Sequence, residues 1–163
     1  MDLDEEAQQQ MTSDYRTYTR MYADNHSDQV RISEGLEDLV YESEALDWST
    51  KKVVVVSKYE VKWGQNRDFF EGIVNGSLKN LKESGHAVAH YASRHLYGSG
   101  ADWHTYQFFD TWADFAAFEQ ANISVEMDEA GKKFWSAIEG HDDEILVLIG
   151  GHDPETKKFG LAK

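Results

Sequence analysis

The segment HAVAHYASRHLYGSGADWHTYQFF, residues 86–109, decides the fold of this chain. It holds four of the chain's seven histidines among several aromatic residues, in the pattern of two strands joined by the sequence GSG at 98–100. A glycine-containing turn between two such runs is the strongest short-range signal of a β-hairpin. The segment therefore predicts two antiparallel strands. It also raises the question of whether its histidines form a metal site, an acid/base site in a pocket, or neither.

The residues on either side of this hairpin complete a pattern of six elements. The β-branched run at 52–61 predicts a buried strand, and residues 63–85 predict a helix that stops at a glycine. After the hairpin, residues 111–121 predict a second helix, one or two further helical turns are expected at 132–140, and the apolar run at 142–151 predicts a last strand. The acidic run that begins this last strand, Asp142, Asp143 and Glu144, is expected to be its solvated entrance.

The order strand, helix, strand, strand, helix, strand is that of the split βαβ unit. We therefore predict an α+β fold, a ferredoxin-like βαββαβ arrangement with a four-stranded antiparallel sheet and two helices on one face. Right-handed crossovers place the first and third of these strands side by side in the centre. The other sheet face carries many apolar residues and has no cover of its own, which predicts a homodimer through that face.

The first 50 residues differ in composition from the rest of the chain. They hold 13 acidic and 3 basic side chains, whereas residues 51–163 hold 17 and 13. Residues 1–12 are expected to be frayed, a short amphipathic helix is expected from Ser13, and Ser33 is expected to cap a second helix. The predicted organisation is an acidic helical N-terminal extension at 1–50, a ferredoxin-like domain at 51–152 and a polar C-terminal tail at 153–163.

Composition excludes several classes of protein. The net charge of −14 repels phosphate backbones and anionic lipid, so we expect neither nucleic acid nor a membrane surface as a partner. The chain has no cysteine, which excludes disulfides and thiolate metal sites. No stretch approaches the roughly 18 apolar residues that cross a bilayer, and the N-terminus lacks a signal peptide. A cytoplasmic location is expected on that ground, although a processed exported chain would look the same.

Metal ligands must converge on one point, and the histidines of the hairpin meet this condition poorly. His86 and His90 are about 13 Å apart along a strand. With a two-residue turn at 99–100, His95 would face His104 at roughly 5 Å between Cβ atoms. One pair of imidazoles without zinc-type spacing does not make a metal site. We therefore expect no metal and no cofactor.

The hairpin nevertheless mixes aromatic walls with a few polar groups, as small-molecule cavities do. We predict His95 and His104 as catalytic residues, because an imidazole exchanges protons near neutral pH. The predicted substrate-binding residues are Tyr91, Arg94, Tyr97 and Tyr106. Each of these residues also has an ordinary structural interpretation, such as a surface ion pair for Arg94 or a hydrogen-bonded interface position for a histidine.

The order of elements, with YQFFDTWADFAAFEQ at 106–120, resembles the dimeric α/β-barrel superfamily, and within it the antibiotic-biosynthesis monooxygenase-like and stress-responsive domains. The resemblance covers about residues 52–150. Members often have Glu-x-Trp at the end of a strand and a histidine on the next helix, whereas Gln107, Phe109 and Phe118 occupy those places here. The resemblance implies paired sheets in a dimeric barrel and a hydrophobic cavity between each sheet and its helices.

Three functions follow as hypotheses. The first is a homodimeric domain that binds a small apolar or aromatic compound, with cofactor-independent monooxygenation or isomerisation as candidate chemistry. The alternative is a non-catalytic homodimeric interaction module, in which residues 1–50 wrap the partner subunit. The third is haem binding, which requires an accessible axial histidine. A fold of this kind does not choose among them.

Overall fold

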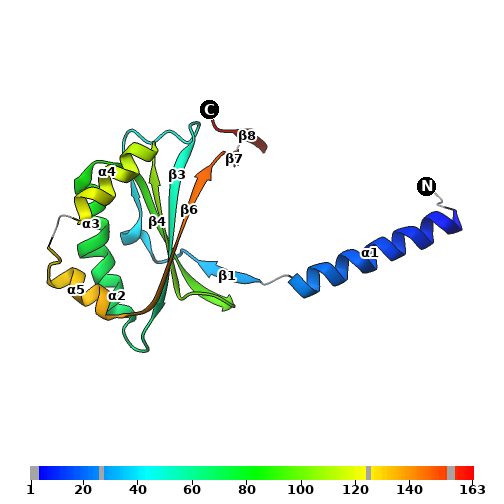
Figure 1. The fold of residues 1–163 in the computed structure, drawn as a ribbon, viewed down its shortest axis with the longest axis horizontal. Coiled ribbons are helices and arrows are strands. Elements are labelled where there is room, and N and C mark those ends of the chain that lie inside the picture. Colours follow the sequence, from blue (N-terminus) through cyan, green and yellow to red (C-terminus); the bar gives the residue numbers. More distant parts are fainter. Residues whose placement is uncertain (1–3, 26–27, 124–125, 154–156) are drawn as a thin grey trace.

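The computed structural model describes residues 4–25, 28–123, 126–153 and 157–163. Figure 1 shows an antiparallel sheet with a layer of helices on one side and a single long helix that extends away from both. The prediction of a mixed α+β fold built on an antiparallel sheet is confirmed. We call the face of the sheet that the helices cover the helix face, and the opposite one the open face.

Four strands form the main part of the sheet. They are β3 (Lys52–Val61), β4 (Ala87–Gly98), β5 (Trp103–Phe109) and β6 (Ile138–Leu148). They pair in the order β4-β5-β3-β6, and all pairs are antiparallel. The first and third predicted strands, β3 and β5, are therefore neighbours in the centre, as right-handed crossovers require.

The sheet is larger than the four strands that we predicted. Two further strands, β1 (Gln29–Ile32) and β2 (Tyr41–Glu42), both pair with β4. Both come from the first 50 residues, so the sheet crosses the boundary that composition suggested at residue 51. That boundary as a division between domains stays a prediction.

The second helix predicted after Ser33 is wrong. Residues 37–39 form only one turn of 3-10 helix, η1 (Glu37–Leu39), between β1 and β2. Gly35 has a φ of 75°, which breaks a right-handed helix before it can extend. Leu36 and Leu39 are instead buried in the core, and the Leu39 carbonyl oxygen accepts a hydrogen bond from Nδ1 of His90 at 2.7 Å. Burial against β4 therefore overrides the local helical spacing.

The helix layer has three parts. The predicted helix at 63–85 is observed as a continuous run of α2 (Asn66–Gly72), the π-helical turn η2 (Ile73–Ser77) and α3 (Leu78–Ser84), and it ends at Gly85 with a φ of 68°. The second predicted helix is α4 (Trp112–Ile123). The third part, α5 (Glu129–Ser136), lies where one or two helical turns were expected, and its N-cap Asp128 accepts a hydrogen bond from the Gly131 amide at 2.8 Å.

The hydrophobic core lies between this helix layer and the helix face of the sheet. Phe69 is fully buried at its centre, with ring centroids 5.2 Å from both Tyr59 and Phe134. α2 and α5 pack unusually closely, because a Cβ atom on Gly72 would lie 2.5 Å from Cβ of Phe134. The core is a single cluster of strand and helix side chains, which includes Val53, Val55, Ile73, Leu78, Leu81, Trp103, Phe109 and Phe118.

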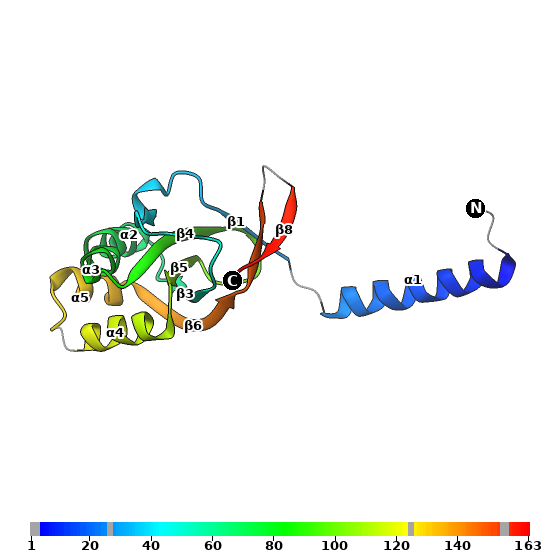
Figure 2. The same cartoon turned by 90° about the horizontal axis from the view of Figure 1, so that it is seen from above.

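The two ends of the chain add elements outside this core. The helix α1 (Glu5–Asn25) starts well before Ser13, so the expectation of a frayed segment through residue 12 is wrong from residue 5 onward. Figure 2 shows α1 standing apart from the sheet. The predicted polar tail contains strand β8 (Lys158–Leu161), which pairs with β7 (Gly150–Asp153). Among the described helices, none is both long and apolar enough to cross a bilayer.

Candidate functional site

The hairpin of β4 and β5 has a different register from the predicted one. Ser93, not His95, lies opposite His104, and Tyr91 lies opposite Tyr106. The expected pairing of His95 with His104 is therefore wrong. The cause is a longer connection, in which Gly98 and Gly100 have positive φ and the His95 amide donates to the Asp102 carbonyl at 2.6 Å. Because the shift amounts to two residues, each side chain keeps its predicted face.

A chain of hydrogen-bonding groups crosses the open face. Nε of Arg31 in β1 donates to Oγ of Ser93 at 2.9 Å. That hydroxyl lies 3.3 Å from the Tyr106 hydroxyl, which in turn lies 3.4 Å from Nδ1 of His104. Burial, together with the positive charges of Arg31 and Lys58, lowers the pKa of His104 to about 4. The imidazole is therefore neutral at pH 7 and suited to accept a hydrogen bond in this network.

The other predicted site residues do not gather around this network. Tyr91 lies further along β4 and donates to a carboxylate oxygen of Glu42, while burial and this carboxylate raise its pKa. Arg94 and Tyr97 are exposed near the end of β4, and Nε2 of His95 lies 3.0 Å from the Gly98 carbonyl oxygen. The six predicted residues thus follow the length of the hairpin. Their catalytic and binding roles stay predictions.

One end of the open face is covered by a loop. The Trp48 ring packs edge-on against Phe108, with centroids 5.2 Å apart, and stacks on Tyr91 at 6.3 Å. The fully buried Lys52 fastens this loop to the sheet, because its Nζ donates to the Asp47 carbonyl at 2.6 Å and lies 3.0 Å from Oδ1 of Asp110. Trp48 itself remains 44% exposed, so the cover is partial.

A cleft of about 400 Å³ opens on the helix face, and we call it the helix-side cleft. Its floor consists of Val55, Ser57 and Tyr59 of β3 and Gln107 of β5, which strand alternation directs toward the helices. The helix layer contributes Gly72, Gly76, Ser77, Asn80, Phe118, Glu119, Asn122, Gly131, Phe134 and Trp135, and the remaining lining residues are Glu126, Met127, Asp128, His141 and Asp143. None of the six predicted site residues lines this cleft.

Small residues keep this space open. A Cβ atom on Gly76 would have no neighbour nearer than the Gly131 backbone nitrogen at 4.0 Å, so there is unfilled space beside this glycine. Ser57 occupies a position on β3 between Val55 and Tyr59, where a larger side chain would fill the floor. The sequence therefore leaves a hollow between sheet and helices instead of a close-packed layer.

Two polar groups of the cleft, His141 and Asp143, lie side by side on β6. Nε2 of His141 lies 3.1 Å from Oδ1 of Asp143, two residues further along the same strand face. The His141 ring stacks on Tyr59 with centroids 4.8 Å apart and an interplanar angle of 13°, and Trp135 meets it edge-on at 5.3 Å. The imidazole is thus held by an aromatic ring on each of two sides and by a carboxylate, which fixes its orientation.

Two titratable groups of the cleft have shifted pKa values. Burial, and then the charge of Asp143, raise the pKa of Glu119 on α4 above that of an ordinary glutamate. Burial also raises the pKa of Tyr59, which is therefore a neutral hydroxyl at pH 7. A carboxyl with a raised pKa close to a second carboxylate is a common arrangement for proton transfer. The cleft therefore contains groups able to give and take a proton.

The sequence reasoning missed these residues for a specific reason. The run Asp142, Asp143 and Glu144 was expected to be solvated, and all three side chains are at least 46% exposed, but alternation in β6 also divides them between two faces. Asp142 and Glu144 pair with Nζ of Lys58 on the open face, at 3.8 and 2.8 Å, whereas Asp143 lines the helix-side cleft. The period of two in β6 was the signal that could have placed His141 and Asp143 together.

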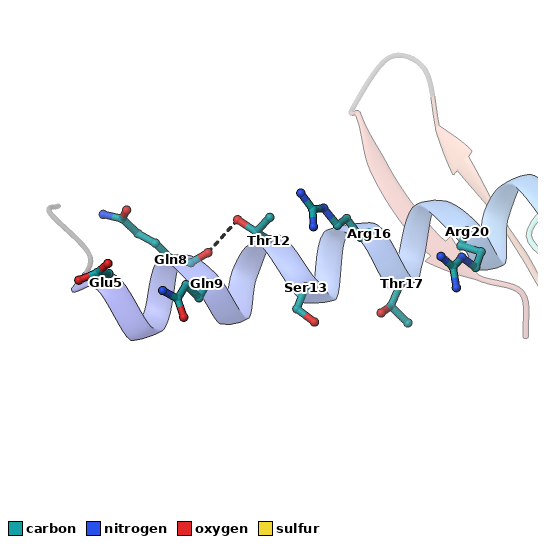
Figure 3. Close-up of a pocket in the computed structure, with 8 residues that line it drawn as sticks. All are labelled: Glu5, Gln8, Gln9, Thr12, Ser13, Arg16, Thr17 and Arg20. Atoms are coloured by element: carbon teal, nitrogen blue, oxygen red, sulfur yellow. Dashed lines mark hydrogen bonds between the residues drawn. The ribbon is translucent and has the colours of Figure 1, made fainter.

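Two other possible sites have less to support them. A groove along α1 is formed by a single helix, with its lining side chains projecting from that helix alone (Figure 3). It is lined by Glu5, Gln8, Gln9, Thr12, Ser13, Arg16, Thr17 and Arg20, and it has no second wall. In addition, no three histidine, aspartate or glutamate side chains of the described residues converge as a metal site.

Comparison with known proteins gives structural neighbours only. No protein-family model matches the chain, and the curated proteins contain no significant match. An anthrone oxidase-like protein matches at 17% identity and a TM-score of 0.47, over 66% of this chain and 50% of its own length. A protein named as a monooxygenase from Lactobacillus acidophilus NCFM matches at 9% identity and a TM-score of 0.47, over 76% of this chain and 51% of its own.

A NIPSNAP family protein of unknown function from Agrobacterium tumefaciens matches at 14% identity and a TM-score of 0.45, over 62% of this chain and 90% of its own length. The chain therefore spans about half the length of the first two proteins and most of the third. The fold of this chain is defined by its own strand order, β4-β5-β3-β6, with the helices on one face.

Proposed function

We propose that this chain binds a small molecule with an apolar or aromatic part in the helix-side cleft, and that the cleft exchanges protons with it. The observation that carries the proposal is the cleft itself, which combines an aromatic wall with many polar and charged groups and has a volume within the usual range of small-molecule sites. Tyr59, Phe134 and Trp135 supply the aromatic surface. Ser57, Gln107 and Asn80 supply hydrogen-bonding groups that orient a ligand.

Proton transfer is the chemistry that the polar groups support best. Glu119 has a raised pKa, and the oriented imidazole of His141 lies beside Asp143. One of these groups would remove a proton from the bound compound and another would return it. Proton removal is a step that cofactor-independent monooxygenation and isomerisation can share, so both reactions named from the sequence are compatible with the site.

The test is a binding screen of neutral aromatic compounds by thermal shift, followed by NMR titration of the indole and amide signals. Compounds that bind should shift the Trp135 indole signal, assigned with Trp135→Phe. We expect His141→Ala and Glu119→Gln to retain binding but abolish any turnover, whereas His95→Ala on the open face should leave both unchanged. A screen without a single compound that perturbs Trp135 would rule the proposal out.

A second candidate function, a homodimeric interaction module, is favoured by the exposed surface of β6. This strand is at the edge of the sheet, and Ile145, Leu146 and Val147 are each 44% exposed or more. Such a contiguous apolar strand is typical of an interface. We propose that two copies of the chain associate through the open face, as the sequence predicted, and that the β6 edge takes part in the contact. Light scattering of wild type and Leu146→Lys tests this, and a wild-type mass equal to one chain would contradict it.

A further inference from the structure

The helix-side cleft has an unusual balance of charge. None of the described residues that line it is a lysine or an arginine. Four of them carry carboxyl groups: Glu119, Glu126, Asp128 and Asp143. Two of these carboxylates already have local partners, because Asp128 caps α5 and Asp143 lies beside His141. Glu119 and Glu126 come from two different segments of the chain, and no ion pair among the described residues offsets their charge.

The aromatic wall of the cleft complements this charge. Trp135 is 44% exposed and lines the cleft beside His141, with their ring centroids 5.3 Å apart. The face of an indole ring attracts an organic cation, and a tryptophan does so more strongly than other aromatic residues. A hollow with an indole wall, a phenol on its floor and carboxylates at its edge has the composition of sites that bind aromatic or alkyl ammonium groups.

We infer that the natural ligand of the helix-side cleft is an organic amine, with a protonated nitrogen near Glu119 and Asp143 and an apolar or aromatic body against Trp135 and Tyr59. This inference rests on the proposed function and specifies the substrate class for the same cleft. The alternative occupant, an anionic compound such as a carboxylate or a phenolate, would meet four carboxyl groups and, among the described lining residues, no lysine or arginine. The net charge of −14 also attracts cations toward the protein from solution.

Lys133 on the helix layer does not supply a free cation to the cleft. Nζ of Lys133 on α5 is bound to Oδ1 of Asp68 at 2.8 Å and to Oε2 of Glu71 at 3.2 Å, and Lys133 is not a lining residue. Its positive charge is therefore paired with carboxylates of α2. A bound amine would supply the positive charge that balances the carboxylates of the cleft.

The test compares three compounds that share an indole ring and a two-carbon arm but differ in charge: tryptamine, tryptophol and indolepropionate. Affinities are measured by isothermal titration calorimetry on the full chain at pH 7 and low salt, and the Trp135 indole NMR signal locates binding. We expect tryptamine to bind about tenfold more tightly than tryptophol, and indolepropionate to bind more weakly than either.

Variants separate a local effect from the overall charge. Glu119→Gln should weaken tryptamine binding about fivefold and change tryptophol binding less than about twofold. The matched control is Glu83→Gln on α3, which changes the net charge equally but lies outside the cleft, and it should leave tryptamine binding unchanged.

The outcomes distinguish the two proposals. Tryptophol or indolepropionate binding in the cleft as tightly as tryptamine would overturn the amine inference and leave the proposed function standing. Equal weakening of tryptamine by Glu83→Gln and Glu119→Gln would also overturn it, since the effect would then come from net charge. If none of the three compounds shifts the Trp135 signal, the amine inference fails, and a simultaneous failure of the neutral aromatic screen removes the proposed function too.

Discussion

Phe108 and Phe109 are neighbours in β5, yet they belong to two very different regions of the molecule. Phe109 points to the helix face, is fully buried, and has ring centroids 5.5 Å from both Phe115 and Phe118 of α4. Phe108 points to the open face, where the rings of Trp48 and Tyr91 lie against it. The helix face is thus completed by the chain's own helices, apart from one cleft. The open face has a partial cover and a polar network.

The helix face and the open face therefore contribute differently to folding stability and to association with other chains. The helix face holds most of the buried aromatic core, so it supplies the larger part of the folding free energy. The open face keeps Arg31, Ser93, Tyr106 and His104 in a hydrogen-bonded chain, which an apolar monomer core would not need. We therefore expect substitutions on the helix face to act on folding, and substitutions on the open face to act on β1 docking and on association.

The largest effect is expected from the two adjacent phenylalanines. Phe109→Ala should lower the free energy of unfolding by about 3 to 5 kcal/mol, because it leaves a cavity in a fully buried aromatic cluster. Phe108→Ala should lower the free energy of unfolding by less than half as much when the protein concentration is low. Urea unfolding at two protein concentrations checks this. Equal losses for both variants would show that the open face is as well packed as the helix face.

Two histidines of the same hairpin, one on each face, allow the two faces to be compared by the pH dependence of folding stability. Burial lowers the pKa of His90 on the helix face to about 4, far below the ordinary value of 6.5. The unfolded chain therefore binds a proton more readily than the folded one, so stability is full above pH 6.5 and is lost as the pH falls toward 4. The loss attributable to His90 is about 3 kcal/mol.

His90→Asn should remove most of this pH dependence, because asparagine can still donate to the Leu39 carbonyl but does not titrate. The comparison variant is His104→Gln on the open face, whose pKa is also lowered to about 4, partly by the charges of Arg31 and Lys58, so this variant should reduce the pH dependence by a separate contribution. Urea unfolding of each variant between pH 7 and pH 4 measures the difference. A His90→Asn protein with an unchanged pH profile would contradict the assignment.

A smaller effect is expected where the helices meet over the helix face. Gly72→Ala places a Cβ atom 2.5 Å from Cβ and 2.9 Å from Cα of Phe134, so α2 and α5 must separate at a cost of about 1 to 3 kcal/mol. Gly76→Ala is the matched control, since its nearest neighbour would be 4.0 Å away. It should be neutral or slightly stabilising. Thermal unfolding of both variants checks the expected order, and a Gly76→Ala protein less stable than Gly72→Ala would reverse it.

The smallest effect is expected on the open face. Arg31→Gln removes hydrogen bonds from the guanidinium to Ser93 and to the carbonyl oxygens of Ala101 and Asp102, and it should cost about 1 to 2 kcal/mol. The loss should be concentrated in β1, which this side chain fastens to β4. Amide hydrogen exchange measures it, with faster exchange expected at Val30 and Ile32 and no change in β3. Uniform loss of protection across the sheet would mean that Arg31 supports the whole fold.

Much of the candidate site lay beyond the sequence reasoning, and the residues show why. Alternation identified the correct faces of Tyr91, His104 and Tyr106, but the length of the turn decided which residues stand opposite one another. The residues of the helix-side cleft come from β3, β5, β6 and the helix layer, and their spacing in the sequence carries no sign of a common site. A site assembled from several elements is decided by how those elements pack.

The sequence by itself determined the order of strands and helices between Lys52 and Leu148, the place of the β4-β5 hairpin and the face to which each of its side chains points. These are properties of local periodicity and of glycine, which act within a few residues along the chain. Tertiary structure alone decided the rest: that Leu36 and Leu39 join the core instead of a helix, that β1 and β2 extend the sheet, and that His141 and Asp143 line a hollow beneath α4 and α5. These outcomes depend on burial between segments far apart in the chain, because the free energy of such contacts can exceed the small preferences of any one segment.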